Sequence, residues 1–491
     1  MNTLDLNFPE LVRDKSYING EWVGSQRTFD VYDPATQEKI ATLPDQDPEV
    51  VDTTIDAAYD AFKEFKKTSP RVRSRLLRKW FDLMTEHTDD LAKIVTWENG
   101  KPILEATGET KYAASYFEWY AEEAPRMYGH TIQPSNPKNR AYTSLEPVGV
   151  VSIITPWNFP IAMITRKAGA AIAAGCTVVV KPDAQTPLSC LALAFLAEKA
   201  GIPKGVFNVV LSATKVPEFG LKLCKNKKSK KISFTGSTNV GKILMEQSSS
   251  SLKKCSFELG GNAPVIVFND ARLDQAVAQA IATKFRGLGQ TCVCANRIYV
   301  QSGIYDEFAQ KFANAVLKFK IGNGFDKLTT HGPLINEKAI EKVESHVKDA
   351  ISKGAKVIVP GGRIPELGPN FYSPTVLTNI TNDMRVCSEE TFGPLGALIK
   401  FETCQEVIDM ANDVDYGLAS YVFSENVNTV HLVSEALECG MVSCNTGIFT
   451  DAAIPFGGVK ESGYGREGSL YGILDYTVVK TVTIGNLSLE N

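Results

Sequence analysis

Between residues 148 and 235, short β-branched runs alternate with longer helical patterns, and this alternation constrains the fold more than any other feature. The runs are VGVVSII, TVVV, VFNVVL and KISFT, and the helical patterns Ile161–Ala174 and Pro187–Ala200 end at Gly175 and Gly201. Strands that recur about every 25–30 residues with helices between them are typical of βαβ units. We therefore predict an α/β fold whose parallel sheet is covered by helices on both faces.

Three other parts of the chain show different patterns of predicted secondary structure. Strand-like runs recur from PVIVF (264–268) to residues 441–443 and predict a second α/β domain, and the N-terminal third is helix-rich, with a helix over 47–68 and another from Ser69-Pro70 to about Gly100. Segments 126–145 and 470–491 fit neither block. The tail YTVVKTVTIGN alternates like an exposed strand, and exchange of strands between subunits would give it a partner.

Composition limits the kinds of ligand. The 491 residues carry 52 Lys and Arg against 56 Asp and Glu, a formal net charge of -4. No long-range positive field is available to attract nucleic acid or anionic lipid, so we expect small ligands. The stretch from Lys222 to Lys231 is rich in lysine, and we interpret it as a solvated loop, with an anion-binding patch as the alternative.

Targeting and metal signals are missing from the sequence. The most apolar stretch, Ala168–Val180, is well short of the roughly 20 residues that span a bilayer, and we expect no membrane segment. MNTLDLNFPE has no apolar or Arg-rich leader pattern, so a cytoplasmic location is predicted. The ten cysteines are scattered and the five histidines isolated, which predicts reduced thiols and no metal site.

Two segments carry residues of chemical interest. In FRGLGQTCVCANR (285–297), Cys292 lies in a Gly-rich turn that lets a substrate approach, and either a catalytic thiol or a structural cysteine fits; Cys294 reads as a core thiol. In SFELGGNAP (256–264), Glu258 ends a strand between Phe257 and Leu259, where desolvation would raise its pKa toward that of a general base; a surface Glu is the alternative.

Two further turns follow strands of the first block. FTGSTNVG (234–241) opens a helix whose free backbone N–H groups could meet a phosphate, although the pattern differs from GxGxxG. In ITPWNFP (154–160), the amide of Asn158 could donate to an oxyanion, and a turn-forming Asn is the alternative.

Together these segments resemble the motif series of the aldehyde dehydrogenase superfamily, in the family's order: ITPWNFP, KPDAQTP (181–187), FTGSTNVG, FELGG, GQTCVCANR, EETFGPL (389–395) and PFGGVKESGYGREG (455–468). The resemblance implies a Rossmann-like cofactor domain (1–125 and 146–258), a catalytic domain (259–469) and a small bridging domain (126–145 and 470–491) that builds homo-oligomers, dimers or tetramers. It also implies Cys292 as nucleophile, Glu258 as base, and Asn158 with the Cys292 backbone N–H as oxyanion hole. The presence of the base implies hydrolysis of a thioester rather than transfer to coenzyme A.

The resemblance also implies a cofactor site. Lys181 would reach the adenosine ribose, and Ala184 stands where members that prefer NAD often carry a Glu. Without that carboxylate to repel a 2′-phosphate, we predict NADP, with NAD as the alternative. The residues implied in binding are Ile154, Thr155, Pro156, Trp157, Lys181, Ala184, Gly236, Ser237, Glu390 and Phe392.

The substrate is implied by one branch of the family, whose members oxidise succinate semialdehyde in γ-aminobutyrate degradation. Arg166, Arg286 and Thr450 stand where that branch holds the substrate carboxylate, and two guanidiniums near a cysteine would favour its thiolate. The predicted partner is thus a small aldehyde with a carboxylate; glutarate semialdehyde or a broad aldehyde set is the alternative. In this branch Cys292 and Cys294 can close a disulfide, which makes Cys294 a candidate redox switch. A non-catalytic structural protein and a thiol esterase are the competing classes.

Overall fold

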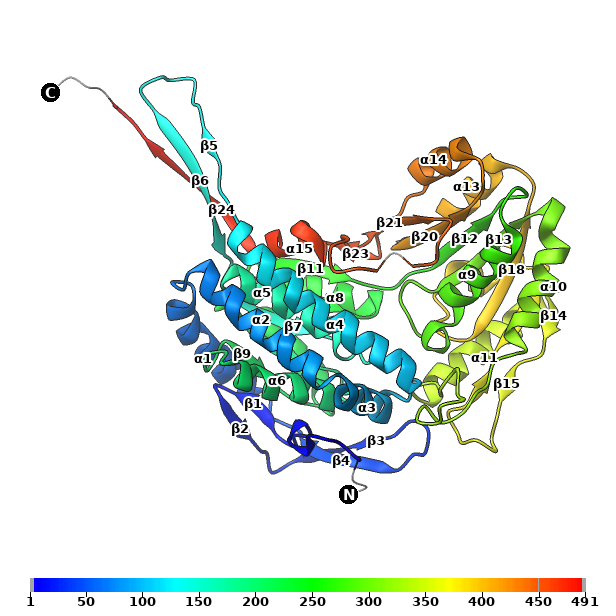
Figure 1. Cartoon of the computed structure of the whole chain (residues 1–491), viewed down its shortest axis with the longest axis horizontal. Helices are drawn as coiled ribbons and strands as arrows, with labels where there is room; N and C mark the ends of the chain where they lie inside the picture. The colour runs from blue at the N-terminus through cyan, green and yellow to red at the C-terminus, as the bar shows by residue number, and fades with distance from the viewer. Residues whose placement is uncertain (1–3, 449, 488–491) are drawn as a thin grey trace.

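The computed structural model describes residues 4–448 and 450–487. Its body holds two large sheets, and a narrow arm projects from it (Figure 1). The first sheet has the order β2-β1-β9-β8-β7-β10-β11-β23, and β9, β8, β7, β10 and β11 are parallel. Its strands are β1 (Ser16–Ile18), β2 (Glu21–Val23), β7 (Val150–Ile154), β8 (Thr177–Lys181), β9 (Phe207–Val209), β10 (Ser229–Thr235), β11 (Lys254–Glu258) and β23 (Gly463–Tyr464).

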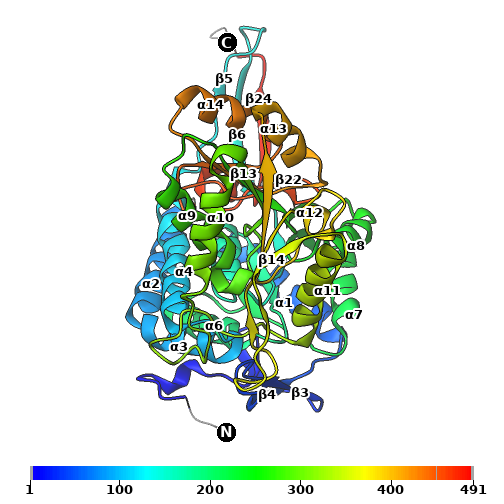
Figure 2. The same cartoon turned by 90° about the vertical axis from the view of Figure 1, so that its right-hand side faces the viewer.

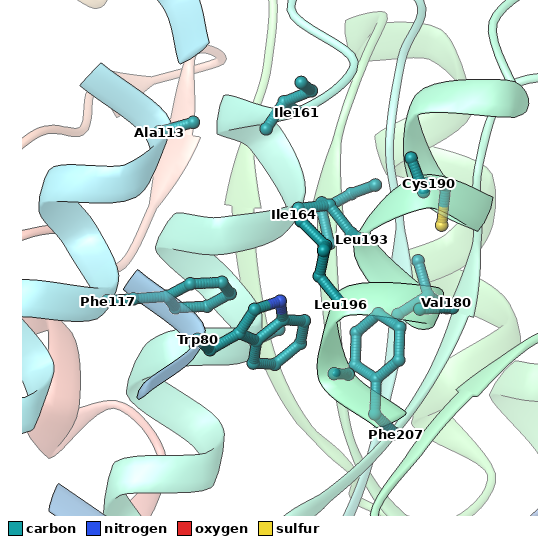
Figure 3. Close-up of a cluster of buried hydrophobic side chains, with 14 of the residues drawn as sticks. Trp80, Ala113, Phe117, Ile161, Ile164, Val180, Cys190, Leu193, Leu196 and Phe207 are labelled. Carbon is teal, nitrogen blue, oxygen red and sulfur yellow. The ribbon is translucent and has the colours of Figure 1, made fainter. Parts of the chain in front are cut away.

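Helices cover both faces of this sheet, as the alternating pattern predicts. One face carries α1 (Glu49–Phe65), α7 (Val216–Lys225) and α8 (Thr238–Ser249). The other carries α2 (Pro70–Glu86), α3 (Thr88–Asn99), α4 (Ile103–Glu123), α5 (Ala162–Ala174) and α6 (Leu188–Ala200). On this second face Trp80 of α2 stacks on Phe117 of α4 at 4.2 Å between ring centroids and meets Phe207 of β9 edge-on at 5.2 Å (Figure 3). Large aromatic surfaces therefore join the helices to the sheet.

The second sheet has the order β14-β17-β18-β13-β12-β20-β21 and is parallel except for β14. Helices α9 and α10 pack on one face and α11 to α14 on the other (Figure 2). The strands are β12 (Ala263–Val267), β13 (Ala295–Gln301), β14 (Lys356–Val359), β17 (Thr375–Thr378), β18 (Leu395–Phe401), β20 (Ala419–Phe423) and β21 (Met441–Cys444). The helices are α9 (Leu273–Phe285), α10 (Tyr305–Val316), α11 (Glu337–Ser352), α12 (Arg385–Ser388), α13 (Cys404–Asn412) and α14 (Val427–Ala436).

The arm is a three-stranded sheet of order β24-β6-β5. It consists of β5 (Thr131–Ile132), β6 (Arg140–Pro147) and β24 (Thr477–Ile484), with α15 (Ser469–Leu474) at its base. The tail strand β24 pairs along its whole length with β6 of the same chain, from Thr477 opposite Pro147 to Ile484 opposite Arg140. The tail thus finds one partner within its own chain, and its other edge stays unpaired in the monomer.

The remaining elements are small. They are the pairs β3 (Thr28–Tyr32) with β4 (Lys39–Pro44), β15 (Gly362–Arg363) with β16 (Tyr372–Ser373) and β19 (Tyr416–Gly417) with β22 (Val459–Lys460), and 3-10 turns at Pro9–Leu11, Ala124–Arg126, Arg286–Gly289 and Ser302–Ile304.

Two local expectations need correction, and one group of strands was not expected. The helix expected to run from residue 70 to about 100 breaks at His87 into α2 and α3. The Lys-rich stretch is only partly solvated, because Lys231 lies inside β10 and is fully buried. The N-terminal strands β1 to β4 carry no pattern that predicted them, since two of them are three residues long.

Candidate functional site

The parallel register of the first sheet brings several predicted residues to one edge. At the strand ends, Ile154 of β7 lies opposite Lys181 of β8, and Thr235 of β10 lies opposite Glu258 of β11. The turns that follow these strands therefore open at the same edge, where open α/β sheets bind ligands. The Asn158 turn and the Gly236-Ser237 turn both lie there.

A cavity of about 300 Å³ opens at this edge and reaches across to the second sheet. Nine predicted site residues line it: Pro156, Trp157, Asn158, Gly236, Ser237, Glu258, Cys292, Glu390 and Phe392. The rings of Trp157 and Phe392 meet edge-on at 5.6 Å. Ser237 also caps α8 by accepting a hydrogen bond from Val240 N, and Gly236 and Ser237 line the cavity at the start of this helix. The residues fit a dinucleotide, because aromatic rings, a helix N-terminus and a carboxylate share one cleft.

The nucleophile candidate lies in a turn rather than an extended stretch. Cys294 N donates to Thr291 O at 2.9 Å, which closes a turn around Cys292. Asn158 Nδ2 donates to Gln290 O at 3.0 Å, so the amide is held beside this turn with its second N–H still free to donate. Asn158 and Cys292 are both buried, at 5% and 8% exposed. Asn158 therefore places an amide donor in the cavity that Cys292 lines, as an oxyanion hole requires.

Glu258 lies between the thiol and an arginine. Glu258 and Cys292 line the same cavity, and Arg166 Nη2 donates to Glu258 Oε2 at 2.8 Å. Arg166 is also paired with Glu467, which in turn binds Lys167. The Arg166 guanidinium lies over the ring of Phe456 at 4.4 Å. Arg166 is thus buried in an ion-pair network behind the catalytic carboxylate and, unlike Arg286, does not line a described cavity.

The pKa of Cys292 is raised well above the usual thiol range. Burial is the largest cause, the nearby Glu258 carboxylate is the next, and Arg166 opposes both. The expected stabilisation of the thiolate by two arginines is therefore outweighed by burial and by Glu258. Arg166 is itself ion-paired with Glu258 and Glu467. The raised pKa favours the protonated thiol, and the Glu258 carboxylate lies in the same cavity.

A second cavity, of about 670 Å³, lies on the other side of the Cys292 turn. Arg286, Thr450, Cys294 and Tyr112 line it. Arg286 is exposed and its guanidinium lies 5.1 Å from the Phe159 ring centroid. The two thiols of the turn therefore face different cavities: Cys292 the narrower one and Cys294 this wider one.

The predicted adenosine-ribose contacts lie farther along the same edge. Lys181 is 4% exposed and its Nζ donates to Pro182 O at 3.0 Å, while Thr155 N donates to Lys181 O at 3.2 Å. Burial lowers the pKa of Lys181. Ala184 lines a third cavity of about 480 Å³, which shares Ile335 and Asn336 with the cavity at Cys292.

Glu390 closes the other wall. Gly261 N donates to Glu390 Oε1 at 3.0 Å, and burial raises the pKa of Glu390 to about 7. A Cβ at Gly261 would lie 2.4 Å from the Cys292 backbone oxygen, so only glycine allows the two segments to approach so closely.

Sequence reasoning missed several residues that hold the site together. Gln290, Glu467 and Lys167 stand inside or beside quoted motifs but carry no pattern that marks a partner. Lys101 and Glu109 come from a helical region far from any motif, yet Lys101 Nζ donates to Asn158 O at 2.7 Å. Only the fold brings these segments to the catalytic turn.

Two features are absent from residues 4–448 and 450–487, a metal-ligand cluster and a membrane-spanning helix. Within these ranges no group of three or more His, Cys, Asp or Glu side chains is arranged to hold a metal ion. In the same ranges no helix has the length and apolar character needed to cross a membrane. The ten cysteines are all free thiols.

The fold and the Cys–Glu–Asn constellation define a class of enzyme. Residues 22–482 match the family model described as "Aldehyde dehydrogenase family", and the chain belongs to that family. It is 65% identical over 483 residues to the Saccharomyces cerevisiae protein named succinate-semialdehyde dehydrogenase [NADP(+)], covering 98% of this chain and 97% of that one. The fold is that of the family: an Escherichia coli structure titled as an NADP dependent enzyme matches with TM-score 0.96 and 50% identity, covering 98% of this chain and 100% of the other.

Two other relatives bear on substrate and location. The Pseudomonas putida protein named glutarate-semialdehyde dehydrogenase is 52% identical, covering 98% of this chain and 100% of that one. The Rattus norvegicus protein named succinate-semialdehyde dehydrogenase, mitochondrial, is 54% identical, covering 97% of this chain and 92% of that one.

Proposed function

We propose that this aldehyde dehydrogenase oxidises succinate semialdehyde to succinate with NADP. The observation that carries the proposal is the placement of Cys292 in one turn between two cavities. Glu258, Asn158, Glu390 and Phe392 line the narrower one. Arg286 and Thr450 line the wider one, where a guanidinium and a hydroxyl are suited to a substrate carboxylate. The 65% identical yeast relative supports the same substrate and cofactor.

The chemistry starts with a proton transfer. Glu258 takes the proton of the Cys292 thiol, and the sulfur attacks the aldehyde carbon to form a thiohemiacetal. The oxyanion is bound by Asn158 Nδ2 and the Cys292 backbone N–H. NADP, when bound, supplies the hydride acceptor that makes oxidation to the thioester possible. Glu258 releases this first proton to solvent and then removes a proton from water, whose oxygen attacks the thioester carbon. The C–S bond breaks, the carboxylic acid leaves, and the sulfur takes a proton back to regenerate the thiol.

The cofactor would be held by residues at the sheet edge. Glu390 and Phe392 would contact the nicotinamide ribose, Ser237 the pyrophosphate, and Lys181 with Ala184 the adenosine end, and Trp157 lines the same cavity as the first three. Because Ala184 offers no carboxylate, the 2′-phosphate of NADP meets no like charge there. The cofactor domain would comprise 1–125 and 146–258, the catalytic domain 259–469 and the bridging domain 126–145 and 470–491; residues 1–3, 449 and 488–491 of these lie outside the described ranges.

A kinetic matrix tests substrate and cofactor together. Succinate semialdehyde, glutarate semialdehyde, betaine aldehyde and hexanal are each assayed with NAD and with NADP. We expect the highest kcat/KM for succinate semialdehyde with NADP, by at least about tenfold, or roughly 1.4 kcal/mol. Arg286→Ala should lower kcat/KM for this substrate far more than for hexanal. Arg272→Ala, which removes an exposed arginine paired with Glu425, is the control.

Glutarate semialdehyde is the second candidate, because the P. putida relative carries that name. If glutarate semialdehyde has the highest kcat/KM, the substrate is reassigned and the proposed chemistry at Cys292 stays the same. We also propose a role in γ-aminobutyrate degradation and a cytoplasmic location; the mitochondrial rat relative is the reason to test the latter by cell fractionation.

Cys294 is proposed as a redox partner of Cys292. Both thiols are free and only Val293 separates them in the sequence. They face different cavities, so a disulfide requires the turn to rearrange. Peroxide should inactivate the chain reversibly, with recovery in dithiothreitol. If Cys294→Ala inactivates and recovers in the same way, Cys294 has no such role.

A further inference from the structure

The turn that carries Asn158 is held from outside by the segment that joins α3 to α4. Asn99 Nδ2 donates to Trp157 O at 3.0 Å, and Lys101 Nζ donates to Asn158 O at 2.7 Å. These bonds hold the carbonyl groups of the two peptides on either side of the Asn158 Cα atom. They come from residues 190 or more positions away from the Cys292 turn.

Glu109 of α4 holds the other end of the same turn. Its Oε1 accepts hydrogen bonds from Ile161 N at 3.0 Å and from Ala162 N at 3.4 Å, where α5 begins. Its Oε2 accepts from Lys101 Nζ at 2.6 Å. A single ion pair therefore contacts the oxyanion turn at its catalytic residue and at the helix start four residues later.

Burial of the Lys101–Glu109 ion pair costs desolvation free energy, and the needs of core packing do not account for charged residues here. Lys101 is 6% exposed and Glu109 0%. The ammonium also lies 4.1 Å from the Phe159 ring centroid, and the Arg286 guanidinium lies 5.1 Å from the same ring. A buried ion pair loses much of its attraction to desolvation, and an apolar pair of similar volume often serves stability as well.

We propose that Lys101 and Glu109 are positioning residues for the oxyanion hole. The Lys101 ammonium fixes the plane of the peptide after Asn158 and so the direction of its Cα–Cβ bond, while the bond from Asn158 Nδ2 to Gln290 O fixes the amide. Neither Lys101 nor Glu109 touches the reacting atoms. The inference rests on the proposed function only in needing an oxyanion at Cys292, whichever aldehyde supplies it.

A small cavity makes the proposal testable by chemical rescue. About 240 Å³ of space lies beneath the turn, lined by Lys101, Asn158, Phe159, Glu105 and Arg286, among others. In Lys101→Ala this space extends into the volume that the lysine side chain leaves. An alkylammonium ion such as ethylammonium or propylammonium can then reach both Glu109 and the Asn158 carbonyl oxygen.

The experiment compares reactions that need the oxyanion hole with one that does not. Aldehyde oxidation and hydrolysis of p-nitrophenyl acetate both form an oxyanion at Cys292, whereas alkylation of Cys292 by iodoacetamide forms none. In Lys101→Ala we expect kcat for both oxyanion reactions to fall about 100-fold, with the alkylation rate unchanged and activity restored by propylammonium.

The matched control is Lys253→Ala. Lys253 is another buried lysine that donates to backbone carbonyl oxygens, those of Asn226 and Ser229, but it lies where β10 begins, opposite the catalytic edge. We expect no loss of kcat and no rescue there. The uncharged double variant Lys101→Met with Glu109→Gln leaves no unpaired buried charge and carries the test if Lys101→Ala does not fold.

Two results would overturn the proposal. One is a soluble double variant with the wild-type kcat; the other is a Lys101→Ala variant in which alkylation slows as much as oxidation, because that points to a damaged thiol rather than a misplaced amide. A wild-type chain that oxidises no aldehyde contradicts the proposed function instead, and ester hydrolysis still reports on Lys101.

Discussion

Cys292 is a buried thiol whose electrostatic neighbours include a carboxylate and an arginine. Burial and the Glu258 carboxylate raise the pKa of its thiol, and Arg166 compensates only in part. In the proposed mechanism the proton moves to Glu258 when substrate is present, so one carboxylate serves both the nucleophile and, later, the water. The ion pair between Arg166 and Glu467 reduces the stabilisation that the arginine can give to a Cys292 thiolate.

Cofactor choice is the prediction that belongs to a single side chain. Ala184→Glu places a carboxylate in the cavity that Ala184 lines, where it repels the 2′-phosphate of NADP. We expect the KM for NADP to rise at least about tenfold, equivalent to 1.4 kcal/mol of binding free energy, and the KM for NAD to change little. Initial rates with each cofactor at saturating aldehyde measure this. Ala184→Gln is the control: it has nearly the same shape without the charge, and if it raises the NADP KM equally, charge is not the cause.

At the residue scale, motifs predicted the site's main members but not their charge environment. Nine of the predicted residues share one cavity, because the turns after β7, β10 and β11 open at one edge of the first sheet, and the Cys292 turn and the Glu390–Phe392 segment line the same cavity. The direction of the Cys292 pKa shift escaped prediction, since it depends first on burial of the thiol and then on its pairing in space with Glu258, 34 positions away in the sequence. No local pattern reports such a pairing.

Helix α11 illustrates how an element supports the site. His346 is fully buried on this helix, and its ring nitrogens lie 3.1 Å from Thr391 Oγ1 and 3.3 Å from Glu389 Oε2. These two residues flank Glu390. The imidazole therefore anchors the segment that forms one wall of the cofactor cavity.

This anchor predicts a pH dependence of stability. Burial lowers the pKa of His346 from 6.5 to about 4; Glu389 opposes the shift, while Lys342 and Arg385 add to it. The unfolded chain binds the proton more readily, so the contribution of His346 to the free energy of unfolding is present above pH 6.5 and is lost as the pH falls toward about 4. The loss is at most about 1.4 kcal/mol per pH unit.

Urea denaturation of the wild type and of His346→Gln at pH 7, 6 and 5 measures this term. Carboxylates titrate in both proteins, so the difference between the two curves isolates the histidine. We expect His346→Gln to be less stable at pH 7 and the gap to narrow at lower pH. A gap that stays constant would show that His346 does not titrate in this range.

At the element scale, long regular patterns were predictable and short ones were not. The helices Ala162–Ala174 and Leu188–Ala200 follow the expected ranges closely, because apolar residues fill them and Gly175 and Gly201 adopt positive φ at their ends. The first sheet also gains β1 and β2 as edge strands. Their three residues each are too few for an alternation to show, and tertiary pairing alone defines them.

The arm is the part of the whole molecule that combines an unpaired strand edge with exposed apolar side chains. β24 has one unpaired edge and exposes Val478, Val479 and Ile484, and β5 and β6 expose Ile132 and Tyr142. Exposed edges and apolar side chains on a projecting sheet favour association with another copy. We propose that the chain forms a homo-oligomer, a dimer or tetramer, through this arm.

Val479→Lys tests the arm. Val479 is 66% exposed, so a lysine there leaves the monomer fold intact but places a charge in the proposed contact. Light scattering should show a smaller assembly than the wild type at the same concentration. Val427→Lys, at a 76% exposed valine on α14, is the control and should keep the wild-type mass. A monomeric wild type, or an unchanged mass for Val479→Lys, would rule out this role.

The central claim is that the substrate is oxidised while bound to the sulfur of Cys292. Acid quenching during turnover of succinate semialdehyde with NADP, followed by peptide mass spectrometry, measures it directly. We predict a succinyl group on the peptide that contains Cys292 and none when Cys292 is replaced by Ser. Steady NADPH production with an unmodified Cys292 peptide, or with the acyl group on another residue, would contradict the account.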